Sequence, residues 1–329
     1  MTLIRMGLQI PNFTYQGVAP ERLFETVATQ AVAAEAAGFD SIWLMDHFYQ
    51  LPMLGAPDTE MLECYTTLAA IAARTKKVRV GAMVGGVTYR NPAYLAKVVT
   101  TLDVVSAGRA IWGIGAAWFE QEHVGFGYDF GSFTERFEKL EETLQIVKSM
   151  FTNHTTSFEG KWFTVRDAYN VPKPIQAGGP PVLIGGSGER KTLRMVAQYA
   201  EACNLFGGPN DMRHKLEVLD EHCARIGRDP KTICRTRLGT LIVGRTHEEA
   251  IAQRDAILGA RGLTWDQLPA EMQTALSTTF VLGGADEVRE QVQAFLDTGL
   301  DGLVFNMPGA PDPETIAVAG EVLTPVLLR

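Results

Sequence analysis

The feature that most constrains this chain is a regular alternation of short apolar runs with longer amphipathic segments. Eight runs have the length and composition of strands, at 3–10, 41–45, 78–84, 110–114, 182–185, 202–206, 236–243 and 302–306. Most are continuously apolar, which is typical of parallel strands buried on both faces. Segments with helical periodicity lie between them, at 20–37, 91–106, 133–150, 189–200, 212–226, 248–260 and 286–296. This alternation predicts a single (β/α)8 barrel spanning residues 1–329.

A doubly wound open sheet is the alternative fold. It would more often show fewer strands, and a glycine-rich nucleotide turn after the first of them. The first run is instead followed by Pro11-Asn12-Phe13-Thr14, without a glycine. Gly38 ends the first helical segment, as expected for a left-handed C-terminal cap before a strand. We therefore favour the barrel.

Composition limits the partners. With 30 Lys and Arg against 38 Asp and Glu, the chain has a formal net charge of −8, which argues against nucleic acid or an anionic membrane as a partner. No apolar run approaches the ~20 residues of a membrane span. The N-terminus lacks the pattern of a secretory signal, and the four cysteines show no CxxC spacing. We expect a cytoplasmic protein that acts on a small molecule.

One segment, 152–181, does not follow the alternation of strand-like and helix-like segments. It contains a hairpin pattern at 156–165 with Glu159-Gly160 at the turn, and then a proline-rich approach to the next strand. Insertions of this length on a barrel commonly cover the active face, so we expect that role here. The alternative is a surface loop without a function.

Residues that follow the strands are the candidate site residues, because the C-terminal ends of barrel strands face the active site. Among these, Gly185, Gly186, Ser187, Gly188, Glu189 and Arg190 join a strand to a helix. Free N–H groups at such a helix start bind anions, and glycines allow a phosphate to come close. Ser187 could cap the helix or donate to the phosphate. We expect a phosphate site here; the alternative is a simple glycine turn.

Asp46-His47 is the best acid–base pair of the sequence. A histidine exchanges protons near neutral pH, although a lone histidine after a strand is often structural. The other five histidines show no HxH or HExxH spacing, so we expect no metal site.

The run Gly113–Trp118 superficially resembles a dinucleotide fingerprint, but Trp118 stands at the third glycine position. Its small residues would instead let a flat ring lie against the backbone. Trp118 and Phe13 could form walls of such a site, or simply pack. Glu120 and Glu122 follow and predict the solvated start of a helix.

Several of these stretches together resemble the bacterial luciferase-like flavin and deazaflavin superfamily. They are EAAGFDSIWLMDHF (35–48), YRNPA (89–93), TLDVVSAGR (101–109), GIGAAW (113–118) and IGGSGERKT (184–192). The resemblance extends nearly end to end, and its nearest branch is the coenzyme F420-dependent oxidoreductases.

The resemblance implies a (β/α)8 barrel with an insertion between strands four and five, often a homodimer, that binds a flavin or F420 at its C-terminal face. It implies a non-proline cis peptide at Met83–Val84 under the ring, contacts of Asp46 and of the turn at Ala116 with the cofactor, and a phosphate site at 185–190. It also aligns His47 with the catalytic histidine of F420-dependent sugar-phosphate dehydrogenases.

The chain departs from that pattern in the turn after the fourth strand. Ala116 stands where those dehydrogenases carry an acidic residue, and Ala117 replaces a glycine. The departure argues against a glucose-6-phosphate activity and leaves the proton-transfer role of His47 less secure.

Our first hypothesis is an F420-dependent oxidoreductase that moves a hydride between the deazaflavin C5 and a small organic substrate. His47 would transfer the proton, and Phe13, Tyr15, Phe48, Trp118 and the insertion would shape the pocket. The alternatives are an FMN-dependent monooxygenase on the same barrel, and a carrier or sensor without turnover.

Overall fold

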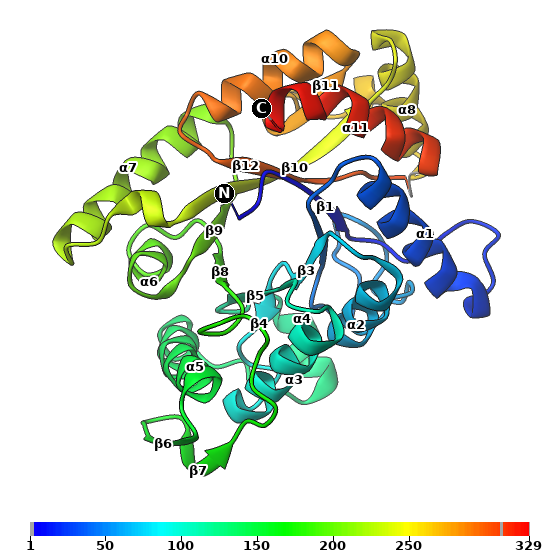
Figure 1. Ribbon diagram of the computed structural model, residues 1–329. Coiled ribbons are helices and arrows are strands. Elements are labelled where there is room, and N and C mark those ends of the chain that lie inside the picture. Colours follow the sequence, from blue (N-terminus) through cyan, green and yellow to red (C-terminus); the bar gives the residue numbers. More distant parts are fainter. Residues whose placement is uncertain (1–2, 310–311, 329) are drawn as a thin grey trace.

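The computed structural model describes residues 3–309 and 312–328. Eight parallel strands form a closed barrel with helices outside it, as predicted (Figure 1). Around the barrel these strands are β1 (Met6–Ile10), β2 (Ser41–Leu44), β3 (Arg79–Ala82), β5 (Ala110–Gly115), β8 (Val182–Gly185), β9 (Ala202–Leu205), β10 (Cys234–Val243) and β12 (Gly302–Asn306). Pairing of β9 with β10 and of β12 with β1 closes the ring.

The helices between the strands match the predicted segments to within a few residues and include several that the sequence pattern did not reveal. They are α1 (Leu23–Ala36), α2 (Cys64–Arg74), α3 (Pro92–Val105), α4 (Glu120–Phe126), α5 (Phe133–Thr152), α6 (Thr192–Tyr199), α7 (Pro209–Arg225), α8 (His247–Gly259), α9 (Ala270–Thr279), α10 (Ala285–Leu296) and α11 (Pro313–Leu327). Short 3-10 turns lie at η1 (Pro20–Arg22), η2 (Pro230–Thr232) and η3 (Trp265–Gln267). The helices α2, α9 and α11 were not predicted, nor were the short strands β4 (Gly85–Gly86) and β11 (Phe280–Gly283), and of α4 only the start was indicated, by Glu120 and Glu122.

The interior of the barrel is filled by side chains that alternate along the strands. Trp43 of β2 is fully buried among apolar residues of other strands. Its indole fits because β1 and β3 carry glycines beside it: a Cβ on Gly81 would lie 2.7 Å from the ring, and one on Gly7 2.9 Å from Nε1. This packing closes the barrel below its mouth, so a ligand can enter only at the ends of the strands.

The position of the insertion corrects one prediction. Its hairpin, β6 (Thr155–Glu159) and β7 (Thr164–Tyr169), forms as expected, but it packs on α5. Further along, Gln176 donates from Nε2 to the carbonyl of Ala110, at the beginning of β5. Segment 152–181 joins the end of a helix to the start of a strand, and such connections lie at the N-terminal end of a barrel. The insertion therefore does not cover the C-terminal face.

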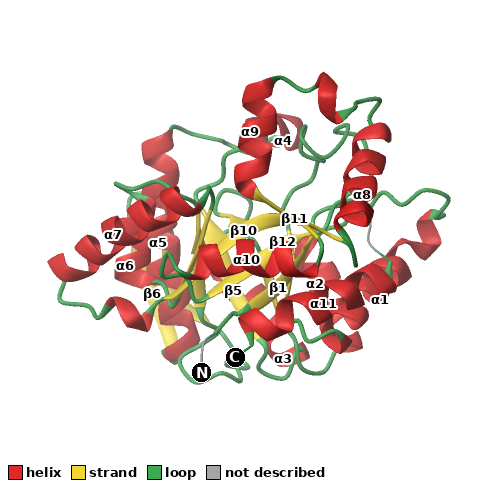
Figure 2. Cartoon of the chain, turned by 90° about the horizontal axis from the view of Figure 1, so that it is seen from above, coloured by secondary structure: helices red, strands yellow, loops and turns green. Residues whose placement is uncertain are grey.

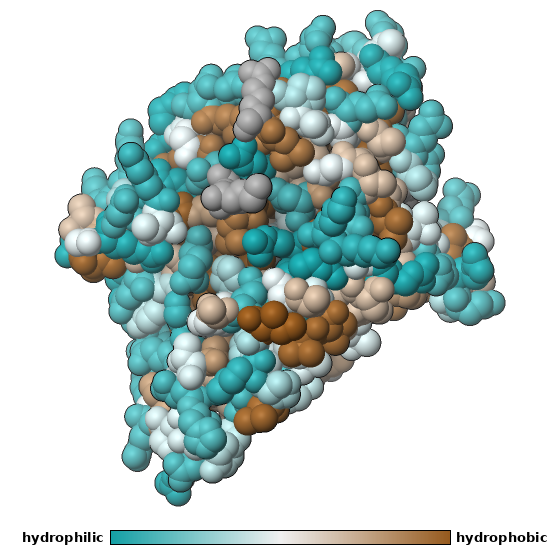
Figure 3. Space-filling model, viewed as in Figure 1, coloured by the Kyte–Doolittle hydropathy of each residue, from teal (hydrophilic) through white to brown (hydrophobic). Residues whose placement is uncertain are grey.

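The two ends of the barrel differ. Figure 2 shows α4 and α9 at one end of the molecule and both chain termini at the other. The face seen in Figure 3 is mostly hydrophilic, with small hydrophobic patches. None of the described helices is long and apolar enough to cross a bilayer.

Candidate functional site

The end of β2 is held in place by a buried ion pair. Asp46 is 2% exposed, and its two carboxylate oxygens accept from Arg90 at 2.7 and 2.9 Å. The Gly86 N–H of β4 also donates to this carboxylate at 3.0 Å. Arg90 is further paired with Glu63, just before α2, and lies over the ring of Tyr65. These contacts bind the loops after β2 and β3 to each other and hold the chain at Asp46, directly before His47.

His47 lies next to this pair and is oriented by a residue from another unit of the barrel. Its Nδ1 is 2.7 Å from Oε1 of Glu122, on α4. The same oxygen accepts a short hydrogen bond from the hydroxyl of Tyr89, and the other oxygen accepts from the Phe48 N–H at 2.7 Å. Glu122 is fully buried, whereas the His47 side chain keeps 14% of its surface exposed.

The burial of Glu122 corrects the expectation that both acids at the start of α4 are solvated. Glu120 is exposed as predicted, but Glu122 is enclosed. Burial alone would raise the pKa of the Glu122 carboxyl, yet the hydrogen bonds and charge of His47, with Tyr89 and the Phe48 N–H, lower it below its usual value. The carboxylate therefore stays ionised in a desolvated place.

The helix α4, which carries Glu122, has only seven residues and would not be stable in isolation. Tertiary contacts therefore hold it in place. The neighbour of Glu122 in this helix, His123, is fully buried, with Nδ1 2.8 Å from the carbonyl of Phe119 and Nε2 2.6 Å from the hydroxyl of Thr88. A carbonyl only accepts, so Nδ1 of His123 donates to it. Gly127 ends the helix at a φ of 73°.

Aromatic side chains surround His47. Trp118 and Phe119 meet its ring edge-on at centroid distances of 5.8 and 5.9 Å. Phe48 contacts Tyr89, Phe126 and Tyr128. Trp118, which is 56% exposed, and Phe126, which is 53% exposed, give this end of the barrel an open apolar surface.

Of the predicted pocket residues, the structure brings Phe48 and Trp118 together around His47. Phe13 is fully buried and Tyr15 is 8% exposed, and both pack in the main core cluster. Burial raises the pKa of Tyr15 to about 12, and its hydroxyl donates to the carbonyl of Asn12. Both residues are therefore part of the core packing, and their role as walls of the pocket stays a prediction.

The backbone after β3 has the cis peptide bond expected at Met83–Val84. The Met83 carbonyl accepts from Nε2 of Gln9, a buried residue of β1. The side chain of Val84 packs over glycines of two neighbouring strands, since a Cβ on Gly115 or Gly185 would come within 3 Å of it. Nearby, Ala116 is half-buried and Ala117 adopts a left-handed φ of 60°, a conformation that favours glycine.

The turn after β8 begins α6 later than predicted. The helix starts at Thr192, and Ser187 is not its cap: the Ser187 hydroxyl accepts from the Phe206 N–H at 3.0 Å. Gly186 has a φ of 123°, which turns the chain away from the strand. No acceptor among the described residues binds the main-chain N–H groups of this turn, which are those of Ser187, Gly188, Glu189, Arg190 and Lys191.

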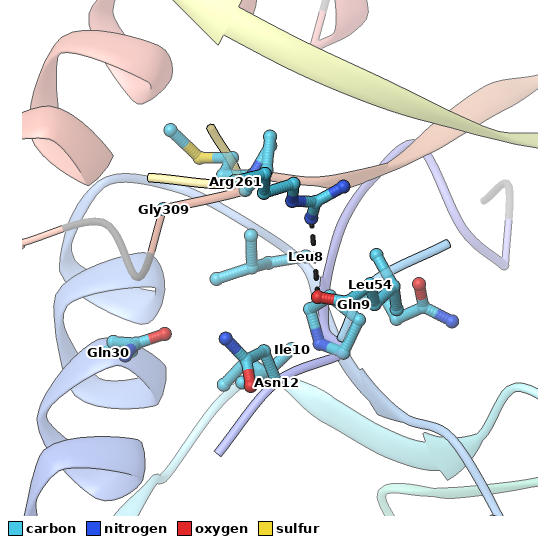
Figure 4. Close-up of a pocket in the computed structure, with 11 residues that line it drawn as sticks. Leu8, Gln9, Ile10, Asn12, Gln30, Leu54, Arg261 and Gly309 are labelled. Carbon is cyan, nitrogen blue, oxygen red and sulfur yellow. Dashed lines mark hydrogen bonds between the residues drawn. The ribbon is translucent and has the colours of Figure 1, made fainter. Parts of the chain in front are cut away.

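A small pocket lies at the ends of β1 and β12 (Figure 4). Its lining includes Gln9, Asn12 and Arg261, and Arg261 donates to the carbonyls of Met53 and Leu54. These bonds bind the segment after α8 to the loop after β2. Within 3–309 and 312–328 no group of three or more His, Cys, Asp or Glu side chains is arranged to hold a metal ion.

Comparison with known proteins agrees with this architecture. The luciferase-like monooxygenase family model matches residues 5–302. The chain belongs to this family.

Among curated members, the chain is 31% identical over 304 residues to an F420-dependent glucose-6-phosphate dehydrogenase of Rhodococcus erythropolis, covering 85% of this chain and 86% of the relative. It is 28% identical to the enzyme of that name from Amycolatopsis mediterranei, covering 90% and 92%. Its fold is similar to that of the coenzyme F420-dependent tetrahydromethanopterin reductase from Methanopyrus kandleri, with a TM-score of 0.78, 17% identity and coverage of 98% and 99%.

Three residues of this candidate site were not assigned to it from the sequence: Tyr89, Arg90 and Glu122. Tyr89 and Arg90 lie in the YRNPA stretch (89–93), which indicated only the family resemblance and no role in the site. For Glu122 the sequence carried no signal, because its burial depends on how α4 packs against the loop after β2.

Proposed function

We propose that this protein is an F420-dependent oxidoreductase that transfers a hydride between the deazaflavin and a small organic substrate. Two curated relatives are named F420-dependent glucose-6-phosphate dehydrogenase, and a structural neighbour is an F420-dependent reductase. The observation that carries the proposal is the turn after β8, whose five unengaged N–H groups suit the cofactor's phosphate. When bound, the cofactor supplies the hydride chemistry at C5.

The residues of the barrel mouth fit such a cofactor. The N–H groups of 187–191 would hold its phosphate, while Glu189 keeps its own carboxylate beside His214 of α7, at 3.2 Å. Val84, supported by Gly115 and Gly185, would lie under the ring. The carboxylate of Asp46 already binds Arg90 and Gly86, so we propose that it positions the backbone beside the ring. His47 would exchange the proton that accompanies the hydride.

We further propose that the substrate is small and mainly apolar. Aromatic side chains surround His47, and Arg90, which pairs with the preceding residue Asp46, is already bound to two carboxylates. A phosphorylated sugar would need cations that are not so engaged. The homodimer and the cytoplasmic location implied by the resemblance remain predictions, and light scattering tests the first of them.

Titration of the purified protein with F420 and with FMN, followed by fluorescence quenching, tests the cofactor. We expect F420 to bind more tightly. We also expect Gly188→Asp to weaken F420 binding by at least about tenfold, because the new carboxylate would repel the phosphate and its Cβ would lie 2.9 Å from the Thr192 hydroxyl oxygen.

The control is Gly259→Asp, at the end of α8, where a Cβ would meet open space. It should bind F420 as the wild type does. Tight binding of FMN with none of F420 would instead favour the monooxygenase. Binding without any oxidation of reduced F420 by nitroaromatics, enones, imines or ketones would favour a carrier or sensor.

A further inference from the structure

We propose that Glu122 is the positioning residue for His47, and that it keeps a hydrogen on Nδ1 so that Nε2 is the nitrogen that exchanges a proton with the substrate. The part of this inference that concerns the substrate rests on the proposed function. The part that concerns the histidine tautomer rests only on contacts within the chain.

The tautomer follows from the donors that meet the carboxylate. Oε1 of Glu122 faces Nδ1 of His47 at 2.7 Å and accepts from the hydroxyl of Tyr89, while Oε2 accepts from the Phe48 N–H. An ionised carboxylate has no hydrogen to donate, so Glu122 accepts in each of these contacts and Nδ1 of His47 is the donor in the first. In the neutral ring the lone pair is then on Nε2.

The second nitrogen is directed away from this network. No described residue makes a hydrogen bond to Nε2 of His47, and the ring retains exposed surface beside Trp118 and Phe119. The buried side of the ring therefore holds the orienting carboxylate, and its other side is available to a ligand. This is the arrangement in which a carboxylate orients a histidine and stabilises the imidazolium that forms during proton transfer.

Glu122 itself is not the proton donor to a substrate. It is fully buried, and four donors already occupy its oxygens, the fourth being the Tyr49 N–H. When an alcohol is oxidised, its O–H bond breaks and Nε2 takes the proton, while its C–H bond gives the hydride to the cofactor and a C=O bond forms. In the reverse direction the imidazolium returns the Nε2 proton to the carbonyl oxygen. In both directions Nδ1 keeps its hydrogen and donates it in a hydrogen bond to Glu122.

The carboxylate that faces His47 does not come from the turn that contains Ala116. The acid expected in the turn after β5 is absent, but α4 places a carboxylate against the histidine six residues later. The two acids of α4, Glu120 and Glu122, are therefore a matched pair for mutation: they have the same chemistry in the same helix, but only Glu122 contacts His47.

The direct test is ¹⁵N NMR of the histidine rings in the cofactor-free protein, with His47→Gln used to assign its signals. We expect neutral His47 to carry its hydrogen on Nδ1. In Glu122→Gln the amide can donate to Nδ1, so we expect the hydrogen to move to Nε2; in Glu120→Gln it should stay on Nδ1. Wild-type His47 with its hydrogen on Nε2, or an unchanged tautomer in Glu122→Gln, would overturn the proposal.

Kinetics give the second readout. Glu122→Gln should lower kcat by about 10²–10⁴-fold, with KM and the F420 dissociation constant changed less than about threefold. Glu122→Asp should restore part of the rate. Loss confined to cofactor binding, or an equal loss in Glu120→Gln, would contradict the assignment.

The two proposals fail separately. If F420 does not bind but the tautomer depends on Glu122, the proposed function fails and the positioning role stands. If F420 is bound and turned over while the tautomer of His47 does not change in Glu122→Gln, the positioning role fails. If Glu122→Gln does not fold, as judged by circular dichroism, Glu122→Asp replaces it. The shorter side chain would hold Nδ1 of His47 less well, so we expect His47 to populate both tautomers. A His47 ring with its hydrogen only on Nδ1 would count against the proposal.

Discussion

Replacement of His47 by alanine is expected to lower kcat by about 10²–10⁴-fold, the usual contribution of a general acid or base. The cofactor should still bind, because its phosphate would be held at the turn after β8, and Phe48 should stay in place because its N–H is bound to Glu122. Measurement of kcat with any compound that oxidises reduced F420, together with an F420 titration of the variant, tests this expectation.

The chain offers a matched control in His247. This histidine also has Nδ1 against a glutamate, at 3.0 Å from Glu287, but its side chain is 52% exposed at the beginning of α8. His247→Ala should leave kcat within about twofold of the wild type, as expected for a solvated pair. A His47→Ala variant that loses only cofactor affinity and keeps its kcat would refute the proton-transfer role.

Arg90→Met is expected to lower the free energy of unfolding by about 3–5 kcal/mol, because it leaves the Asp46 carboxylate buried without its counter-ion. The side chains of the pair are 10% and 1% exposed, so water cannot replace the lost contact. Urea denaturation at neutral pH measures the change, and an unchanged m-value would show that the unfolding transition itself is the same.

Arg74→Met is the control for this variant. Arg74 also binds a carboxylate, Glu25, with both of its terminal nitrogens, but the two side chains are 46% and 45% exposed. Solvated pairs contribute little to stability, so the free energy of unfolding should fall much less in Arg74→Met than in Arg90→Met. If Arg90→Met and Arg74→Met lower the free energy of unfolding equally, the buried Asp46–Arg90 pair does not have the stabilising role proposed for it.

The fold was predictable because its signals are local. Continuous apolar runs such as 182–185 and 302–306 indicated parallel strands without knowledge of their partners, and the observed strands match them. Of helix α4 only the start at Glu120 and Glu122 was indicated, because a helix of seven residues has too little periodicity to detect as a whole. The insertion was found in the right place along the chain, but its covering role was wrong: a segment between a helix and the next strand lies at the N-terminal end of the barrel.

What the sequence by itself determined was the barrel, the position of His47 after β2 and the glycine turn after β8, because strand ends and turns are encoded by neighbouring residues. Only the tertiary structure decided that Glu122 faces His47, that Arg90 neutralises Asp46 and that Phe13 is in the core. The paired residues are 75 and 44 positions apart, and no sequence spacing specifies such contacts. They exist because closing the barrel brings the loops of different strands together, where a buried charge is stable only beside its partner.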